Sequence, residues 1–280
     1  MKIKKCVIAV AGMGTRMLPI TKSVTKEMLT IVDVPAIYLQ VKEAYLSGIK
    51  EIIFVVSKKN IKLIKSFFSK DPELMDFIKN EPKKLELVKE LNEIIKKVTF
   101  HYVIERYPGS YGAVYSARNF LKDEYFGIMY GDDIIDADTP LLKQLIDECI
   151  RTDNMVIAAE KVDRKDFPSY GVIKYTKENI IDELLYDYEH KEDKGDIIHG
   201  RFIAHTKIFK VKDRLIKRKN NELHLPAAIL LFQNEVRALL FEGQYFDIGS
   251  KIGLLKTNIH FALKKDEYKQ ELLEYLKEIK

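Results

Sequence analysis

The sequence predicts a three-layer α/β fold built on a mixed, mostly parallel sheet. Short β-branched runs such as 51–56 (EIIFVV) alternate with helical patterns through the first 160 residues. This βαβ alternation is typical of parallel strands covered by helices on both faces. At 280 residues the chain is long enough to bury a large core. Because we see no Pro/Gly/Ser linker, repeat or low-complexity tract, we expect a single domain over 1–280.

Taken in order, apolar runs predict the strands, and apolar spacing of three and four residues predicts the helices. Strands are expected at 4–10, 51–56, 98–104, 125–130, 154–160, 171–176, 181–188, 199–204 and 235–241. Helices are expected at 36–47, 59–69, 72–95, 111–121, 139–151, 206–217, 224–232 and 250–278. Asp138-Thr139-Pro140 supports the helix start near 139, because proline is favoured in the first helical turn.

Composition and charge exclude several classes of protein. Forty-seven basic and 42 acidic residues give a net charge of +5 on a mixed surface, so we expect no nucleic-acid partner. The cations between 210 and 219 are interpreted as a solvated helix face or loop. No 18-residue apolar run predicts a membrane span, and the first apolar run is too short for a signal peptide, so a cytoplasmic protein without a membrane partner is expected. Cys6 and Cys149 lie in apolar contexts and are expected to be reduced core residues.

The most informative stretch joins an apolar strand to a loop that carries glycines and cations. After the strand ends at Val10, Gly12 and Gly14 allow the backbone to bend and turn its N–H groups on a ligand. Arg16 and Lys26 follow. Two glycines alone are equally compatible with an ordinary tight turn, but glycines and cations together favour a cradle for a polyphosphate.

Neither familiar phosphate-binding loop fits this stretch. The dinucleotide fingerprint needs a third glycine at position 17, which is Met17, and a helix directly after the turn. Pro19 and the following residues predict a loop instead. The Walker pattern fails as well, because no Gly-Lys-Ser/Thr closes the glycines. A longer phosphate loop carrying Arg16 and Lys26 remains.

Two aspartates are candidates for a metal site at the same edge of the sheet. Asp132 follows the strand 125–130 and a glycine, and Asp247 precedes Gly249 and the last helix. Each alone is explained by capping of a turn or helix. In open α/β sheets, however, ligands bind beyond the carboxyl ends of the strands. Nucleoside triphosphates travel with Mg²⁺, which takes one or two carboxylates plus phosphate oxygens, so the pair predicts a Mg²⁺ site.

With these residues in place, the chain resembles the sugar-phosphate nucleotidylyltransferase family, and within it the bacterial UTP–glucose-1-phosphate uridylyltransferases. The resemblance rests on Ala11-Gly-Met-Gly-Thr-Arg-Met-Leu-Pro19 with Thr21-Lys22, Lys26-Glu-Met-Leu29, Ile31-Val-Asp33-x-Pro35, Gly131-Asp132-Asp133, Tyr170-Gly-Val172, Gly200-Arg201-Phe202, Asn220-Asn-Glu222 and Asp247-Ile-Gly-Ser-Lys-Ile-Gly253. It implies a Rossmann-like nucleotidyltransferase fold. The nucleotide-binding half would span about 1–135, the sugar-phosphate-binding half about 136–249, and a C-terminal helix 250–280.

The resemblance also implies a reaction and a set of site residues. A glucose 1-phosphate oxygen would attack the α-phosphorus of UTP in line, giving UDP-glucose and pyrophosphate. Arg16 and Lys26 would be catalytic, and Asp132 and Asp247 would hold Mg²⁺. The nucleotide would be bound by Ala11, Gly12, Gly14, Thr15, Glu105, Gly109 and Gly112, and the sugar phosphate by Gly171, Glu189 and Lys191. A homodimer or homotetramer is expected on the same ground.

The chain departs from the family pattern in four places. Thr25 and Thr30 stand where the family has proline, which should leave this loop freer. Glu105 stands near the family's base-reading glutamine. Because an ionised glutamate only accepts hydrogen bonds, Glu105 suits guanine at least as well as uracil, unless it faces solvent while backbone groups read the base. The sugar-contacting motif is blurred at Glu189-His190-Lys191. The fourth departure is at 222–227, where His224 either contacts substrate or only begins a helix.

Other functions remain open at this point. The same reaction with another nucleoside triphosphate or hexose 1-phosphate is the nearest alternative, because the base and sugar segments are those that depart. A non-catalytic paralogue that binds a nucleotide sugar is a second. Retention of Arg16, Lys26, Asp132 and Asp247 argues against it, since a binding protein would not need the whole set. The missing third glycine disfavours a dehydrogenase.

Overall fold

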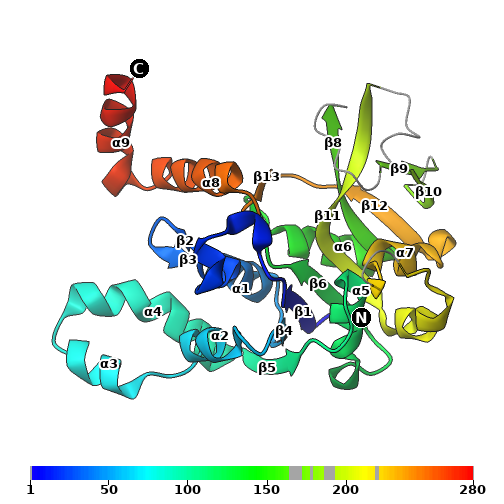
Figure 1. The fold of residues 1–280 in the computed structure, drawn as a ribbon, viewed down its shortest axis with the longest axis horizontal. Helices are drawn as coiled ribbons and strands as arrows, with labels where there is room; N and C mark the ends of the chain where they lie inside the picture. The colour runs from blue at the N-terminus through cyan, green and yellow to red at the C-terminus, as the bar shows by residue number, and fades with distance from the viewer. Residues whose placement is uncertain (1, 164–171, 177–178, 186–192, 218–220, 280) are drawn as a thin grey trace.

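A nine-stranded mixed sheet forms the centre of the molecule (Figure 1). The computed structural model describes residues 2–163, 172–176, 179–185, 193–217 and 221–279. The strands of the sheet are β1 (Lys5–Val10), β4 (Glu51–Val56), β5 (Thr99–Ile104), β6 (Tyr125–Tyr130), β8 (Met155–Asp163), β9 (Val172–Tyr175), β10 (Ile181–Leu185), β11 (Lys194–His205) and β12 (Val236–Leu240). Two small pairs lie beside it: β2 (Thr30–Ile31) with β3 (Val34–Pro35), and β7 (Asp133–Asp136) with β13 (Gln244–Asp247).

The order of the strands brings the expected functional loops to one edge. The sheet runs β10-β9-β11-β6-β1-β4-β5, and β8 pairs with both β11 and β12. Strands β6, β1, β4 and β5 are mutually parallel, so their carboxyl ends share one edge. Antiparallel pairing within this sheet is confined to β11 and its neighbours and to β9–β10 in the second half. The predicted α/β class with a mixed sheet is confirmed.

Helices cover both faces of the sheet. The helices are α1 (Ala36–Leu46), α2 (Ile61–Phe67), α3 (Pro72–Ile78), α4 (Pro82–Lys97), α5 (Ser110–Ser116), α6 (Leu141–Thr152), α7 (Leu225–Leu230), α8 (Lys251–Leu263) and α9 (Asp266–Glu278). Buried residues of α1, α2, α4 and α6 pack with Ile8 of β1, whereas those of α5 and α7 pack with Val7. Neighbouring side chains of one strand thus enter different cores, as alternation in a strand buried on both sides requires. Cys6 and Cys149 are free and buried, as expected.

Three predicted helices are divided and a fourth is of another type. The helix expected at 111–121 is α5 plus a 3₁₀ turn at Arg118–Phe120. The helix expected at 72–95 is α3 plus α4, because Pro82 starts a new helix and the Asp71 carboxylate caps the first by accepting from Leu74 N–H. The helix expected at 250–280 is α8 plus α9, because Lys265 adopts an extended backbone between them. Asp266 and Glu267 then favour a new helix N-terminus. The helix expected at 206–217 is a 3₁₀ segment, Thr206–Arg214.

The pair β7–β13 is the element that sequence reasoning missed and that matters most for the site. Both strands have four residues, too few for an alternating pattern to stand out. Their antiparallel register sets Asp133 opposite Asp247, although 114 positions separate them in the chain. Among the helices that the structure describes, none combines the length and apolar character needed to cross a membrane.

Candidate active site

The loop after β1 has the conformation that its glycines predict. Gly14 has φ +63°, in the left-handed region, and its carbonyl accepts a hydrogen bond from Thr21 Oγ1 at 2.9 Å. A Cβ at this position would lie 3.0 Å from the Thr21 side chain, so both backbone angle and space favour glycine. Short 3₁₀ turns follow in place of a helix, as expected from Pro19. The turn Lys26–Met28 carries Lys26 back over the glycines, with its Cε 3.9 Å from the Cβ position of Gly12.

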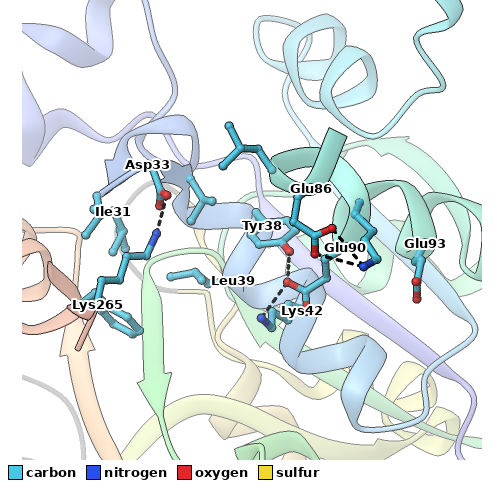
Figure 2. Close-up of a pocket in the computed structure, with 14 residues that line it drawn as sticks. Ile31, Asp33, Tyr38, Leu39, Lys42, Glu86, Glu90, Glu93 and Lys265 are labelled. Carbon is cyan, nitrogen blue, oxygen red and sulfur yellow. Dashed lines mark hydrogen bonds and ion pairs between the residues drawn. The ribbon is translucent and has the colours of Figure 1, made fainter. Parts of the chain in front are cut away.

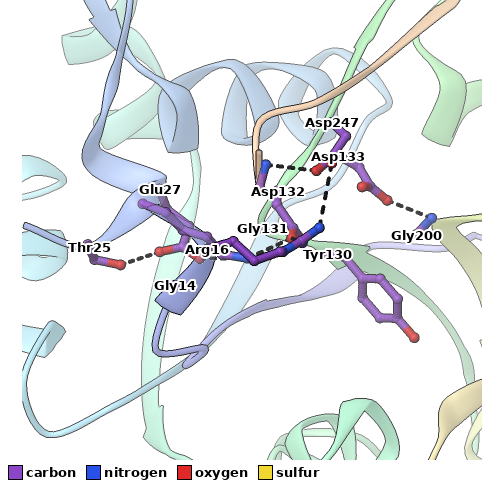
Figure 3. Close-up of polar contacts among 12 residues, drawn as sticks. Gly14, Arg16, Thr25, Glu27, Tyr130, Gly131, Asp132, Asp133, Gly200 and Asp247 are labelled. Atoms are coloured by element: carbon purple, nitrogen blue, oxygen red, sulfur yellow. Dashed lines mark hydrogen bonds and ion pairs between the residues drawn. The ribbon is translucent and has the colours of Figure 1, made fainter. Parts of the chain in front are cut away.

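Four charged side chains meet at the carboxyl edge of the sheet (Figure 3). The Lys26 ammonium donates to Asp132 Oδ2 at 2.6 Å, and Arg16 Nη2 lies 3.5 Å from the same oxygen. Arg16 Nη1 lies 3.7 Å from Asp247 Oδ2. Lys26 is 13% exposed and Arg16 64%, so one cation lies deep and the other faces solvent. The structure thus brings together the two cations and two carboxylates that the sequence singles out.

Backbone contacts hold the two aspartates beside β1. Gly131 N–H donates to the Ala9 carbonyl at 3.1 Å, and this approach leaves no room for a side chain, since a Cβ would lie 2.9 Å from that carbonyl oxygen. Ile248 N–H donates to the Asp132 carbonyl at 3.0 Å, which joins the two aspartate-bearing loops. Asp247 Oδ1 accepts from Gly249 N–H at 2.7 Å. The glycines therefore set the spacing of the carboxylates.

The space between the carboxylates suits one small cation bound together with phosphate. A Cβ on Gly249 would lie 2.9 Å from Asp132 Oδ2, 2.8 Å from Asp247 Oδ1 and 2.5 Å from Arg16 Nη2. Glycine thus keeps a polar space open among these three groups. No cluster of three or more acidic, His or Cys side chains that could hold a metal occurs in the described part of the chain. Two carboxylates, with phosphate oxygens and water completing the shell, are the donor set that Mg²⁺ takes with nucleotides.

Glu27 lies next to Lys26 and is nearly fully buried, with 1% of its side chain exposed. Burial raises the pKa of Glu27 to about 7, against the Lys26 charge and a hydrogen bond from Thr25 Oγ1 that lower it. Burial alone would lower the pKa of Lys26, but the carboxylates of Asp132 and Glu27 raise it above its ordinary value. Lys26 therefore stays charged at neutral pH. Sequence reasoning missed Glu27, which stood out only as a neighbour of Lys26 in its motif.

A second layer of polar contacts supports the aspartate loop from below. Asp133 is buried; its Oδ2 accepts from Gly200 N–H at 2.7 Å, and its Oδ1 accepts from Tyr245 Oη at 3.0 Å. Burial and the neighbouring Asp132 raise the pKa of Asp133. Arg201 donates to the Asp133 carbonyl at 2.7 Å and is paired with Glu43. In the sequence, the signals for these contacts were the position of Asp133 next to Asp132 and the Gly200-Arg201 motif.

The predicted base-reading segment lies at the end of β5, along the same edge. Glu105 is half-buried, and burial followed by the nearby Glu222 carboxylate raises its pKa. Gly109 has φ +90°, and a Cβ there would lie 2.4 Å from the Leu223 carbonyl oxygen. Leu223 N–H donates to the Pro108 carbonyl, and Tyr111 N–H donates to the Leu223 carbonyl. These two hydrogen bonds hold residues 222–223 against this loop. Gly112 is equally constrained, because a Cβ would lie 2.3 Å from the Tyr107 carbonyl oxygen.

The remaining predicted site residues fall into two groups. Ala11, Gly12 and Thr15 lie in the phosphate loop with Gly14 and Arg16. Gly171, Glu189 and Lys191, with His190, lie outside the described residues. Glu105, Gly109 and Gly112 share the sheet edge with the charged cluster, but no hydrogen bond or ion pair joins them to it in the part of the chain described here. His224 stands at the N-cap position of α7, and its side chain makes no capping hydrogen bond there.

A groove of about 540 Å³ lies elsewhere, between α1, α4, α8 and the β2–β3 pair (Figure 2). Its charged side chains are largely engaged with one another. Glu90 accepts from Tyr38 at 2.5 Å and from Lys42 at 2.8 Å, and Lys265 pairs with Asp33. None of the predicted site residues lines it. We therefore assign the candidate active site to the charged cluster and not to this groove.

Comparison with known proteins identifies close relatives of this chain. The model of the nucleotidyl transferase family matches residues 5–261. A UTP–glucose-1-phosphate uridylyltransferase of Staphylococcus saprophyticus is 36% identical over all of this chain and 99% of its own. Among solved structures, a UTP-bound UGPase of Acinetobacter baumannii is 28% identical with a TM-score of 0.83, and each chain is covered completely. A UDP-glucose pyrophosphorylase complexed with UDP-glucose is 27% identical, also with a TM-score of 0.83, over 94% of this chain and all of its own.

Proposed function

This chain belongs to the nucleotidyl transferase family, with the bacterial UTP–glucose-1-phosphate uridylyltransferases, and we propose that it transfers a uridylyl group from UTP to glucose 1-phosphate. The products are UDP-glucose and pyrophosphate. The observation that carries this proposal is the meeting of Arg16, Lys26, Asp132 and Asp247 at one edge of the sheet. A triphosphate that lies over the glycine loop would face both cations.

The proposed roles are those that the family resemblance implies, and the charge and burial of the two cations support them. Lys26 is the buried cation next to the glycines, so it neutralises the phosphates close to the reacting α-phosphorus. Arg16 is exposed and reaches outward, so it neutralises the pyrophosphate as it leaves. N–H groups of 11–15 hold the remaining phosphate oxygens. Such transfers need little covalent chemistry from the protein, because positioning and charge neutralisation stabilise the transition state.

We propose that Asp132 and Asp247 hold Mg²⁺. The polar space that Gly249 keeps open and the two-carboxylate donor set support this assignment. When bound, the ion would supply positive charge to the phosphate oxygens and fix their geometry. The carboxylates' own task is to orient that ion, and Gly249 N–H helps by fixing one oxygen of Asp247.

The division of the chain into two functional halves is also a proposal. Residues 1–135 contribute the phosphate loop, Asp132 and the Glu105 segment, so we assign the nucleotide to this half. The sugar phosphate is assigned to 136–249, with Gly171, Glu189 and Lys191 as its contacts. That one continuous sheet crosses both halves favours a single domain. We also propose a cytoplasmic location, because nucleoside triphosphates, the proposed substrates, are made there.

We propose that the protein self-associates through its last two helices, α8 and α9. Helix α9 has no buried residue in the described chain and stands away from the sheet (Figure 1). Tyr275 of α9 and Ile279 directly after this helix are 57% and 60% exposed, and Ile252 and Leu255 of α8 are 61% and 60% exposed. A 13-residue helix is marginal in water without packing. A second copy that covers these apolar side chains would give it that packing.

Base preference is the least constrained part of the proposal and has its own test. Ionised Glu105 accepts hydrogen bonds only, whereas glutamine also donates to a uracil carbonyl. We therefore expect Glu105→Gln to raise kcat/KM for UTP relative to GTP, measured as pyrophosphate release with each nucleotide. Glu222→Gln is the matched control, because it removes the neighbouring charge and leaves Glu105 in place. An unchanged nucleotide ranking in Glu105→Gln would mean that this side chain does not read the base.

The reaction itself is tested by a screen for pyrophosphate release. Purified protein is incubated with Mg²⁺, glucose 1-phosphate and each of the four nucleoside triphosphates, and then with other hexose 1-phosphates and UTP. The proposal expects the fastest release with UTP and glucose 1-phosphate. Faster release with another pair would establish the same reaction on that pair. Binding of UDP-glucose without release from any pair would instead identify a non-catalytic paralogue.

A further inference from the structure

The carboxylate of Glu27 is buried next to Lys26 with one oxygen lacking a hydrogen bond. Among the residues that the structure describes, Glu27 Oε1 has no hydrogen-bond partner, while Oε2 accepts from Thr25 Oγ1. The nearest cation is the Lys26 ammonium, 3.9 Å from Oε1. Buried carboxylates without a partner are rare, because burial removes the water that would stabilise them. A side chain of this kind calls for a functional explanation.

The Asp132 oxygen that accepts from Lys26 is the one nearest the space where the proposed metal would be held. In this structure Lys26 donates to Asp132 Oδ2 at 2.6 Å, and that oxygen faces the polar space beside Gly249. A carboxylate oxygen that coordinates a divalent cation is a poorer acceptor for an ammonium, because the two positive charges repel each other. Lys26 is 13% exposed, so it cannot simply move into solvent. It needs a second acceptor within reach.

We propose that Glu27 is a positioning residue that receives the Lys26 ammonium when Asp132 turns to the metal–nucleotide complex. Lys26 would thereby have two alternative acceptors. It donates to Asp132 Oδ2 in this structure, and it would donate to Glu27 Oε1 and the phosphates when the nucleotide is bound. The inference rests on the proposed function, because it takes Asp132 as a metal ligand.

The surroundings of Glu27 keep its free oxygen aimed at Lys26. The hydrogen bond from Thr25 holds the other oxygen, and the Cγ atom of Glu27 lies 2.9 Å from the Cβ position of Gly131. Gly131 is the residue before Asp132, so the Glu27 stem packs against the aspartate loop itself. A side chain held on both sides has little freedom to turn toward solvent. Among the described residues, Oε1 is therefore held where the Lys26 ammonium can reach it.

The test uses Glu27→Gln, which keeps the shape and removes the charge. Isothermal titration measures binding of UTP with Mg²⁺ and of UTP with EDTA, both without sugar phosphate, so no turnover contributes. Because a neutral amide holds the lysine less well, Lys26 should stay on Asp132. We expect the affinity for Mg²⁺–UTP to fall about tenfold and that for metal-free UTP to change less than twofold. Thr25→Val keeps the carboxylate but frees it, and should lower Mg²⁺–UTP affinity by a smaller factor.

Glu90→Gln is the matched control, since Glu90 pairs with Lys42 in the separate groove. It should bind both forms of UTP as the unaltered protein does. Equal affinities of Glu27→Gln and the unaltered protein for Mg²⁺–UTP would overturn the proposal, and so would equal weakening of both forms, which would indicate a merely structural role. If the unaltered protein binds no nucleotide, the proposed function fails first, and this result is distinguishable from the others.

Discussion

Asp132 is the residue on which the two cations of the phosphate loop converge. Asp132→Asn keeps the size of the side chain and removes the charge that faces Lys26 and Arg16. We expect turnover to fall by at least about a hundredfold, the range found when one preorganised charge is removed from such a site. The melting temperature should change little, because Asp132 is partly exposed.

Asp147→Asn is the control for that measurement. Asp147 is an exposed carboxylate on α6 that pairs with Lys143 on its own helix. Its loss should leave pyrophosphate release unchanged, since a surface pair of this kind contributes little. Release by Asp132→Asn at the unaltered rate would remove Asp132 from the reacting set.

Glu27 also makes the stability of the protein depend on pH. Its pKa is about 7 in the folded chain against an ordinary value of 4.5, so the folded state holds a proton that the unfolded state loses in that interval. The free energy of unfolding therefore falls as pH rises from 4.5 through about 7. Glu27→Gln cannot ionise at this position, so its free energy of unfolding should not fall for this reason as pH rises. Its advantage over the unaltered protein should grow from near zero at acidic pH to on the order of 3 kcal/mol above pH 7, as urea unfolding measures.

Glu90→Gln tests the sign of that argument. Although partial burial opposes it, hydrogen bonds from Lys42 and Tyr38 lower the pKa of Glu90. Its charged form therefore stabilises the fold, and this contribution is lost as pH falls below the ordinary value. Glu90→Gln should be the less stable protein at neutral pH, opposite to Glu27→Gln. The same pH trend in both variants would contradict the assignment for Glu27.

At the scale of elements, the sequence predicts the strands and helices whose formation depends on neighbouring residues. The parallel strands β1, β4, β5 and β6 begin and end within one residue of expectation, because each is a short run rich in β-branched or aromatic residues. The break between α3 and α4 at Pro82 was not predicted, because apolar residues at helical spacing continue on both sides of the proline. The pair β7–β13 could not be predicted, because its register depends on contacts between distant segments.

The candidate site shows the same division. Glycines, cations and aspartates that follow strands are recognisable locally, and the structure brings Arg16, Lys26, Asp132 and Asp247 together as expected. The groups that support them were not predictable. Glu43 reaches Arg201 from α1, and Tyr245 reaches Asp133 from β13, and only the folded chain creates these pairs.

Arg201 joins three elements below the aspartate loop. From β11 it donates to Glu43 of α1 and to the Asp133 carbonyl of β7, and its side chain is fully buried. Arg201→Met leaves the Glu43 carboxylate buried without its cation. We expect the free energy of unfolding to fall by about 3–5 kcal/mol in urea unfolding, because an uncompensated buried charge is the dominant cost.

The double variant Arg201→Met with Glu43→Gln separates this cost from lost packing. Removal of both charges should restore part of the stability, as expected when the unpaired carboxylate is the main penalty. Lys89→Met, which breaks an exposed pair with Glu86, should cost no more than about 1 kcal/mol. A double variant no more stable than Arg201→Met would show that packing of the guanidinium dominates.

At the scale of the whole molecule, α8 and α9 extend away from the sheet that carries the site (Figure 1). Deletion of residues 266–280 removes α9 and leaves α8, whose Thr257 is buried and whose Asn258 accepts from Val32 N–H. If α9 packs against a second copy, the deletion should convert a dimer or tetramer to a monomer in light scattering. Tyr275→Glu with Ile279→Glu keeps the full chain and places charges on the same face, so it should have the same effect.

Activity distinguishes assembly from folding in that experiment. The strand-end cluster draws on residues up to 249 of one chain, so a folded monomer should retain pyrophosphate release within about threefold, a small change on the scale of transition-state energies. A monomeric full-length protein at all concentrations would contradict self-association through α9, and so would an unchanged oligomer in both variants. Loss of activity with an unchanged oligomer would instead mean that α9 supports the site within its own chain.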